Sequence, residues 1–321
     1  MPLLLRSEDV APLLDIKGAI KVVEAVFVEQ SRGAVAHHGA FHLNVTGGAM
    51  RVTSGALHDT GIMGVRTGTS LGLTAPSGVN NHACVLYGTD GELRGIMGYP
   101  FGTLRTSAVM ASSIDRMARP DAETLGLVGS GRTASALLEG VMAVRNIKKI
   151  SVYSRDAERR KRFCDRASEK LGIPVRPADE MRQVVSGQDI VMTASNQRKP
   201  LFPAEWLDPG THLSSMGPIA ELDEKVLLLA KPLVVASKAL EEEYYLQTPP
   251  FPLLDLIRAG RLTWDDVAEL GEVIDGRVSV RRSRDDITVF HESQGGITDI
   301  ALATSAFNEA VRRGLGQEIS L

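Results

Sequence analysis

Hydrophobic residues recur at intervals of three and four along residues 15–32 and 296–314, so that each segment has one apolar face. This spacing predicts two amphipathic helices, and residues 103–117 also fit a helix. Residues 37–98 instead contain short apolar runs that are separated by glycine-rich turns, a pattern typical of strands. We expect these strands at residues 49–54, 62–66, 82–87 and 93–97.

A different pattern begins near residue 119, where apolar runs of strand length alternate with segments of helical spacing. This alternation predicts βα units, and therefore a parallel sheet with right-handed crossovers. We expect its strands at residues 124–128, 149–153, 189–193, 212–216 and 233–237.

A glycine-rich turn joins the first of these strands to a helix-compatible stretch at residues 135–143. The turn consists of Gly129, Ser130, Gly131, Arg132, Thr133 and Ala134. Gly129 permits a tight turn, Gly131 lets a pyrophosphate approach the backbone, and Ala134 permits close packing of helix on strand. Free N–H groups at the helix start would bind the pyrophosphate. The motif predicts a dinucleotide site; an ordinary strand-to-helix turn is the alternative.

The end of the second strand indicates which dinucleotide is bound. NAD sites usually have an acid there, because a carboxylate binds the ribose 2′-hydroxyl. Here Ser154 and Arg155 occupy the position, and further cations follow at residues 159–161. A hydroxyl and a guanidinium suit a 2′-phosphate. We therefore expect NADP, with NAD as the alternative if these cations form only the solvated first turn of a helix.

Composition narrows the class of protein. The 321 residues carry a net charge of −3 with dispersed basic residues, so we expect no nucleic-acid partner. No apolar run reaches membrane length, so we expect no membrane partner. Cys84 and Cys164 fall in different predicted units, which indicates no disulfide and a cytoplasmic protein. His37, His38 and His42 lack nearby ligands of metal-site spacing, so we expect no metal.

Several segments, taken in order, resemble the ornithine cyclodeaminase and mu-crystallin family. They are residues 104–108, 126–131, 152–155, 220–223, 268–273, 288–295 and 298–299. The resemblance implies an α/β fold, in which a Rossmann-type doubly wound parallel sheet is inserted in a second α+β domain. Residues 119–294 would form the dinucleotide-binding domain. Residues 1–118 plus 295–321 would bind the substrate and form a homodimer.

The resemblance also assigns roles to individual residues. Arg105 matches the family's substrate-carboxylate arginine, and Thr106 would lie near the cofactor. Arg66 stands where the family usually has a lysine that binds the carboxylate and passes a proton. An arginine keeps the charge, but its pKa is too high for ready proton transfer. His82, on a strand that the family aligns along the substrate pocket, is the expected general acid. Purely structural roles are the alternative for each.

Later strand ends should supply further cofactor contacts. These are Thr193, Ala194, Ser195, Met216, Gly217, His291 and Ser293. Just after Gly217, cyclodeaminases carry an acid that is thought to activate the amine or water, whereas this chain has Pro218 and Ile219. Glu221 and Asp223 follow, and they fit a helix N-terminus, where acids favour the helix dipole.

Together these features predict an NAD(P)H-dependent reductase of small, carboxylate-bearing imino acids, either ketimines or cyclic imines. Three alternatives stay open: a cyclodeaminase-type lyase that uses NAD, an alanine-type amino-acid dehydrogenase and a crystallin-like NADP-binding protein. The missing acid counts against the lyase. The dehydrogenase lacks an identified proton shuttle. Arginine in place of lysine at position 66 suits a binding protein.

Overall fold

The computed structural model describes residues 1–46, 48–69, 82–245, 249–293 and 295–320. The chain forms two compact units, residues 1–105 with 294–321 and residues 106–293. Helix α3, Phe101–Met117, begins in the first unit and continues into the second. The domain boundaries implied by the resemblance stay a prediction.

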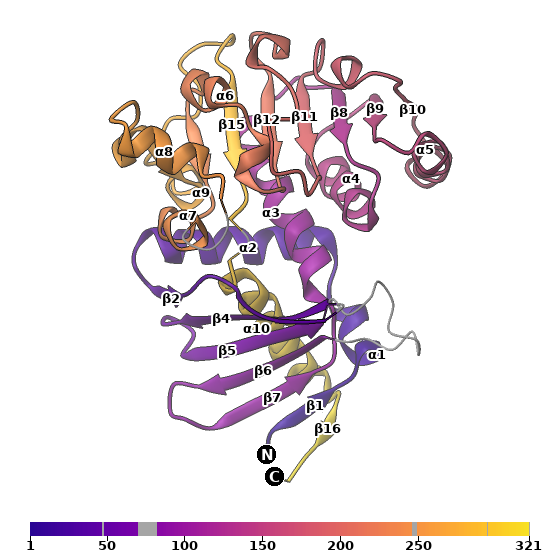
Figure 1. Cartoon of the computed structure of the whole chain (residues 1–321). Coiled ribbons are helices and arrows are strands. Elements are labelled where there is room, and N and C mark those ends of the chain that lie inside the picture. The colour runs from indigo at the N-terminus through magenta and orange to yellow at the C-terminus, as the bar shows by residue number, and fades with distance from the viewer. Residues whose placement is uncertain (47, 70–81, 246–248, 294, 321) are drawn as a thin grey trace. The chain divides into compact units, whose positions relative to one another are not determined.

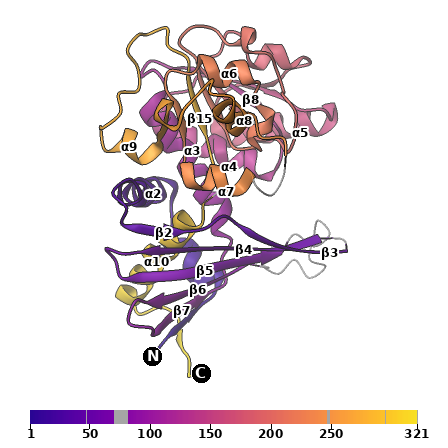
Figure 2. The same ribbon diagram turned by 60° about the vertical axis from the view of Figure 1, so that its left-hand side comes forward.

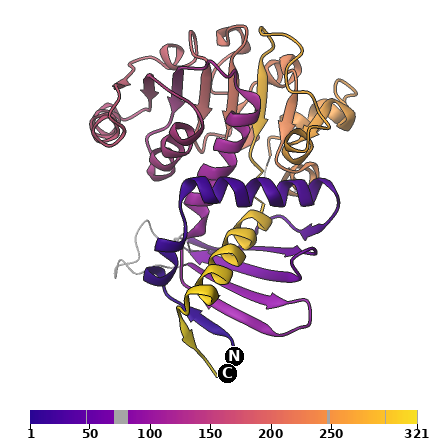
Figure 3. The same cartoon turned by 180° about the vertical axis from the view of Figure 1, so that it is seen from behind.

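In the first unit a mostly antiparallel sheet packs against helix α10, Ile297–Arg313 (Figure 1). The strand order is β16-β1-β7-β6-β5-β4-β2, and β3 pairs with β4. Figure 3 shows α10 crossing one face of this sheet beside α2, Ile16–Ser31. The remaining elements are β1 Leu3–Leu5, α1 Ser7–Val10, β2 Val35–His37, β3 Phe41–Val45, β4 Gly48–Leu57, β5 Ile62–Thr69, β6 His82–Gly88, β7 Leu93–Met97 and β16 Gln317–Glu318.

Helix α10 packs on one face of this sheet, and exposed apolar side chains lie on the other. Gly55, Gly64 and Gly95 let α10 approach closely, because a Cβ at each would come within 3.1 Å of the helix. The cross-strand register places the alternate side chains on the opposite face. Exposed apolar side chains on that face are Phe41, Leu43, Met50, Met63 and Tyr87. In Figure 2, β3 extends this face alongside β4.

The second unit contains a parallel sheet of order β10-β9-β8-β11-β12-β15-β13-β14. This confirms the predicted Rossmann-type fold, whose strand order reverses between β8 and β11 and opens a ligand site there. Its strands are β8 Thr124–Val128, β9 Lys149–Tyr153, β10 Val175–Pro177, β11 Ile190–Thr193, β12 His212–Ser215, β13 Leu233–Val235, β14 Val267–Glu269 and β15 Thr288–His291. Its helices are α4 Arg132–Val144, α5 Ala157–Leu171, α6 Glu224–Leu229, α7 Lys238–Tyr245, α8 Pro252–Arg258 and α9 Leu270–Ile274.

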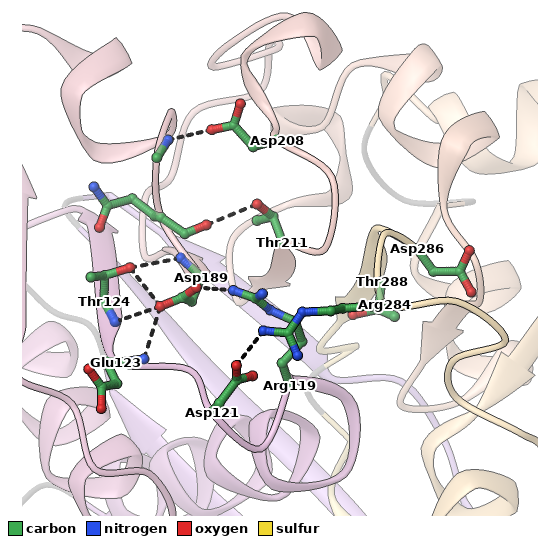
Figure 4. A network of polar contacts seen from close by, with 12 residues as sticks. Arg119, Asp121, Glu123, Thr124, Asp189, Asp208, Thr211, Arg284, Asp286 and Thr288 are labelled. Carbon is green, nitrogen blue, oxygen red and sulfur yellow. Dashed lines mark hydrogen bonds and ion pairs between the residues drawn. The ribbon is translucent and has the colours of Figure 1, made fainter.

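Hydrogen bonds from Asp189 connect the start of β11 to the start of β8 (Figure 4). One carboxylate oxygen accepts hydrogen bonds from the Glu123 N–H at 2.9 Å and the Thr124 N–H at 3.0 Å. The Thr124 hydroxyl adds a third bond, and Arg119 pairs with the other oxygen. Burial alone would raise the pKa of Asp189, but these donors outweigh it and lower that pKa.

We expect Asp189→Asn to lower the free energy of unfolding at pH 7 by about 1.5–3 kcal/mol, because the backbone donors lose a charged acceptor. A lowered pKa means that this stability is present above the unfolded value of about 3.9 and is lost as the pH falls further. Thermal unfolding at neutral pH measures the effect. Asp121→Asn, which removes the exposed pair with Arg284 in the same network, is the control and should leave Tm nearly unchanged. Equal Tm shifts for the two variants would contradict the prediction.

Both cysteines are buried and carry no disulfide. Within the part of the chain that the structure describes, no helix is long and apolar enough to cross a membrane.

Candidate active site

The glycine-rich turn lies between β8 and α4, as predicted. Gly129 has a φ of 128°, and a Cβ there would lie 2.5 Å from the carbonyl oxygen of Ala194, so another residue would be both strained and obstructed. Gly131 is the N-cap of α4, and a Cβ on it would meet no atom within 4 Å. The backbone therefore faces open space at the helix start, a geometry that suits a pyrophosphate.

A pocket of about 630 Å³ opens at this turn. It lies at the ends of β8, β9 and β11, where the strand order reverses, and all of its lining residues belong to the second unit. The predicted residues that line it are Gly129, Ser130, Gly131, Ser154, Arg155, Ala194 and Ser195. The remaining wall includes Tyr153, Asp156, Arg159, Met181, Asn196, Gln197 and residues 199–201. The position and lining fit a dinucleotide.

Three cations line the pocket. Arg155 and Arg159 follow β9, Lys199 lies in the segment after β11, and among the described residues none pairs with their side chains. The nearby acid, Asp156, accepts a hydrogen bond from the Arg159 N–H at 2.8 Å and thereby caps α5. The Ser130 hydroxyl donates to Ser154 at 2.9 Å. Unpaired cations beside hydroxyls suit a phosphate group.

Not every cation of this segment faces the pocket. Arg160 is buried, donates to the Ser154 carbonyl at 2.6 Å and pairs with Asp179 at 3.0 Å. Lys161 forms an exposed pair with Asp165. These two residues have structural partners, whereas Arg155 and Arg159 are exposed. Whether Arg155 and Arg159 bind a phosphate or form only a solvated helix turn stays a prediction.

Glu221 is the main correction to the sequence analysis. It is 1% exposed and does not stand free at a helix start. Its carboxylate accepts hydrogen bonds from Thr193, from Ser195 at 2.5 Å and from Ser215 at 2.9 Å, at the ends of β11 and β12. Burial raises its pKa despite these donors. Asp223, in contrast, caps α6 as expected.

The loop after β12 therefore contains a buried acid, Glu221. Pro218 and Ile219 follow Gly217, where the resemblance implies an acid in the cyclodeaminases, but the Glu221 carboxylate lies against Gly217, where a Cβ would meet it at 2.4 Å. Its two oxygens already accept the three hydroxyl groups. Glu221 thus orders the strand ends around the pocket residue Ser195. Hydroxyl groups at neighbouring strand ends were the only sequence signal for it.

His291 forms a second buried network at the end of β15. Its Nδ1 lies 2.6 Å from Glu241 of α7, and its Nε2 lies 2.9 Å from the Gly217 carbonyl oxygen. Ser293 donates to the same Glu241 oxygen at 2.6 Å. Burial alone would lower the pKa of His291, but Glu241 and the Gly217 carbonyl raise it to about 9. The imidazolium thus holds the Gly217 loop in place, with Glu241 as a partner that sequence reasoning missed.

We expect His291→Gln to destabilise the protein in a pH-dependent way. A raised pKa contributes stability that is complete below the unfolded value of about 6.5 and is lost as the pH rises through 9. The loss in unfolding free energy should therefore reach roughly 2–3 kcal/mol at pH 6 and shrink by pH 10. Thermal unfolding at both pH values measures it, with the exposed His58→Gln as control. A difference that does not depend on pH would contradict the prediction.

The first unit contains the two predicted substrate arginines. Arg66 on β5 and Arg105 on α3 are 5% and 2% exposed. The Nε of Arg66 lies 2.9 Å from one oxygen of Asp299, and the Nε of Arg105 lies 3.4 Å from the other. Two buried guanidinium groups are thus joined by one carboxylate, and their planar forks suit a ligand carboxylate.

His82 starts β6 on the same face of the sheet as Arg66. Its ring packs on Gly68, where a Cβ would lie 2.6 Å from it. Thr106 on α3 and Thr193 at the end of β11 are buried in the second unit. Met216, just after β12, is half-buried in the same unit. The roles of all these residues stay a prediction. Among the described residues, no three His, Cys, Asp or Glu side chains gather as a metal site would require.

Comparisons with known proteins agree with this arrangement. The model of the ornithine cyclodeaminase/mu-crystallin family matches residues 1–314. A Delta(1)-pyrroline-2-carboxylate reductase of Bacillus cereus is 34% identical over 223 residues, which span 67% of this chain and 66% of that protein. The alignment therefore covers slightly less than two thirds of that relative.

Solved structures match over the whole chain. The Thermococcus litoralis Delta(1)-pyrroline-2-carboxylate reductase, in complex with NADH and L-proline, is 26% identical with a TM-score of 0.83, covering 99% of this chain and 100% of that one. An archaeal alanine dehydrogenase dimer with bound NAD is 25% identical with a TM-score of 0.84, covering 100% and 99%.

Proposed function

The chain belongs to the ornithine cyclodeaminase/mu-crystallin family, and from this premise we propose that it is an NAD(P)H-dependent reductase of small imino acids. The observation that carries the proposal is the buried Arg66 and Arg105 pair, joined by one carboxylate, in a chain that also has a dinucleotide pocket. The likeness to two pyrroline-2-carboxylate reductases supports a cyclic imine with a carboxylate beside the C=N carbon.

The residues of this chain bind and orient the substrate. Arg66 and Arg105 receive its carboxylate and so fix the adjacent C=N carbon. A bound nicotinamide supplies the hydride. An imine that is already protonated needs no strong acid from the protein, so arginine in place of lysine at position 66 is no obstacle. His82 would donate a proton only to an imine that binds in its neutral form, so it is helpful but not essential.

We propose that NADP(H) is the preferred cofactor, although the related structures hold NADH or NAD. Arg155, Arg159 and Lys199 bring three cations without a partner among the described residues to the pocket lining, which also includes Ser154. A 2′-phosphate would pair with this charge, whereas a 2′-hydroxyl would leave it unpaired. Gly129, Ser130, Gly131, Arg132 and Thr133 would hold the pyrophosphate.

Reduction is favoured over ornithine cyclisation. The position after Gly217 carries Pro218 and the buried Ile219, and the oxygens of the nearby Glu221 already accept three hydroxyl groups. An NADP-binding protein of the crystallin type is the second candidate, because Arg66 binds a carboxylate but does not readily release a proton. A spectrophotometric screen tests both: NADPH oxidation is followed with cyclic imino acids, and with pyruvate or glyoxylate plus amines. Tight NADPH binding without turnover of any imine would favour the binding protein.

We further propose a cytoplasmic homodimer that forms through the sheet face opposite α10. Buried free cysteines fit a reducing compartment. Phe41, Leu43 and Met63 on that face are 60%, 49% and 39% exposed, which is unusual for large apolar side chains that stay in water. Sedimentation equilibrium should give a mass of twice the 34.5 kDa of one chain. Met63→Lys should lower the measured mass to that of a single chain. A wild-type monomer at micromolar concentration would contradict the dimer.

A further inference from the structure

Asp299 lies at the centre of the arginine pair, on the first turn of α10. Its side chain is fully buried. Besides the two arginine Nε atoms, the Thr53 hydroxyl lies 3.4 Å from the oxygen that Arg66 contacts. The Thr53 hydroxyl also accepts from the Arg66 Nε at 3.4 Å. All four residues belong to the first unit.

The backbone around Asp299 fixes the position of its carboxylate. Gly296 begins α10, and a Cβ there would lie 2.4 Å from the Ser54 carbonyl oxygen of β4. Gly55, the next residue of β4, would place a Cβ 3.0 Å from the backbone of Ile297. The helix start therefore rests directly on the strand, and only the absence of side chains at both positions permits this contact. A carboxylate on that turn has little room to move.

The contacts of Asp299 determine which edge of Arg66 is occupied. A guanidinium is planar and has five N–H donors in a fixed fork, so an acceptor on Nε orients the whole plane. Among the described residues, none accepts a hydrogen bond from either Nη of Arg66. With Nε occupied, the Nη edge of Arg66 can still bind a carboxylate in two places at once.

We propose that Asp299 is the positioning residue of the substrate-carboxylate site: it holds Arg66 and Arg105 by their Nε atoms and turns the Nη groups of Arg66 to the carboxylate of the ligand. The chemical class of the ligand rests on the proposed function. Asp299 also offsets one of two like charges, which allows both guanidinium groups to stay buried side by side. It does not touch the reacting atoms.

Binding of L-proline and L-prolinamide in the presence of NADP⁺, measured by calorimetry, tests the proposal. In Asp299→Asn, an amide NH₂ faces one of the two Nε–H groups, so one arginine loses its orientation. We expect L-proline to bind about tenfold or more weakly, L-prolinamide to be nearly unaffected, and NADPH affinity to stay within about twofold. Thr304→Val, a buried polar change on the same helix that touches neither arginine, should leave all three affinities unchanged.

A double-mutant cycle separates positioning from a general structural role. In an Arg105→Leu background, Asp299→Asn should lower L-proline affinity much less than it does in the wild type. The reason is that both changes act on the same arrangement, in which Asp299 orients the arginines that bind the carboxylate. If Asp299→Asn does not fold, Thr53→Val removes only the hydroxyl that touches both Asp299 and Arg66, and a severalfold loss specific to L-proline is expected. Unchanged L-proline binding, additive losses, or equal losses for L-proline and L-prolinamide would overturn the proposal. Wild-type protein that reduces no imino acid would refute the proposed function alone, because the binding measurements need no turnover.

Discussion

Arg105→Leu is expected to lower kcat/KM for an imino acid by roughly 30-fold to several thousandfold, which corresponds to about 2–5 kcal/mol. Arg105 is 2% exposed, so its charge meets a ligand carboxylate with little screening by water. The KM should rise because the carboxylate loses one of its two partners. The kcat should also fall, because a misplaced C=N carbon receives the hydride poorly.

Steady-state kinetics with an imino acid and with an uncharged imine of the same ring measure the effect. Arg116→Leu, which removes an exposed arginine from the same helix, is the matched control and should leave both constants unchanged. The carboxylate site is wrong if Arg105→Leu turns over normally, or if the wild type reduces the uncharged imine equally well.

Arg155→Ala should weaken NADPH binding by about tenfold to a hundredfold while NADH binding changes little. The reason is that Arg155 lines the pocket without a partner among the described residues, so a 2′-phosphate would gain a charge-assisted contact there. The preference for NADPH should also shrink at high salt, because the arginine is exposed.

Fluorescence titration of both reduced cofactors measures this selectivity. Lys199→Ala should reduce it in the same direction, since Lys199 lines the same pocket from a different segment. Arg166→Ala removes an exposed cation from α5 outside the pocket lining and serves as control. Equal wild-type affinities for NADPH and NADH would show that the three cations do not recognise a phosphate.

The sequence predicts much of this architecture, because its signals are local. The run from β8 through Gly129 into α4 is visible in neighbouring positions of the chain, and helical spacing marks α2 and α10. Short strands such as β1 and β16 escaped prediction, since three residues or fewer show no periodicity. The pairing of β13 with β15 and β14 likewise depends on contacts between distant segments.

The acids of the candidate site show where sequence reasoning stops. Glu221, Glu241 and Asp299 all look like ordinary acids at or near helix starts. Their actual partners are distant in the chain: Glu221 binds Thr193, and Asp299 binds Arg66. Each acid meets its partner only when the sheet of its own unit has folded. Because a buried charge without a partner is costly, burial then fixes the geometry of each pair.

Product analysis with two substrates tests the central claim, reduction of a C=N bond, most directly. Purified protein is incubated with NADPH and Delta(1)-pyrroline-2-carboxylate, and separately with ornithine and a catalytic amount of NAD. We predict that NADPH is consumed in equal amount to the proline formed, and that ornithine releases no ammonia. Proline and ammonia formed from ornithine, with no net consumption of NAD, would contradict the account and identify a cyclodeaminase.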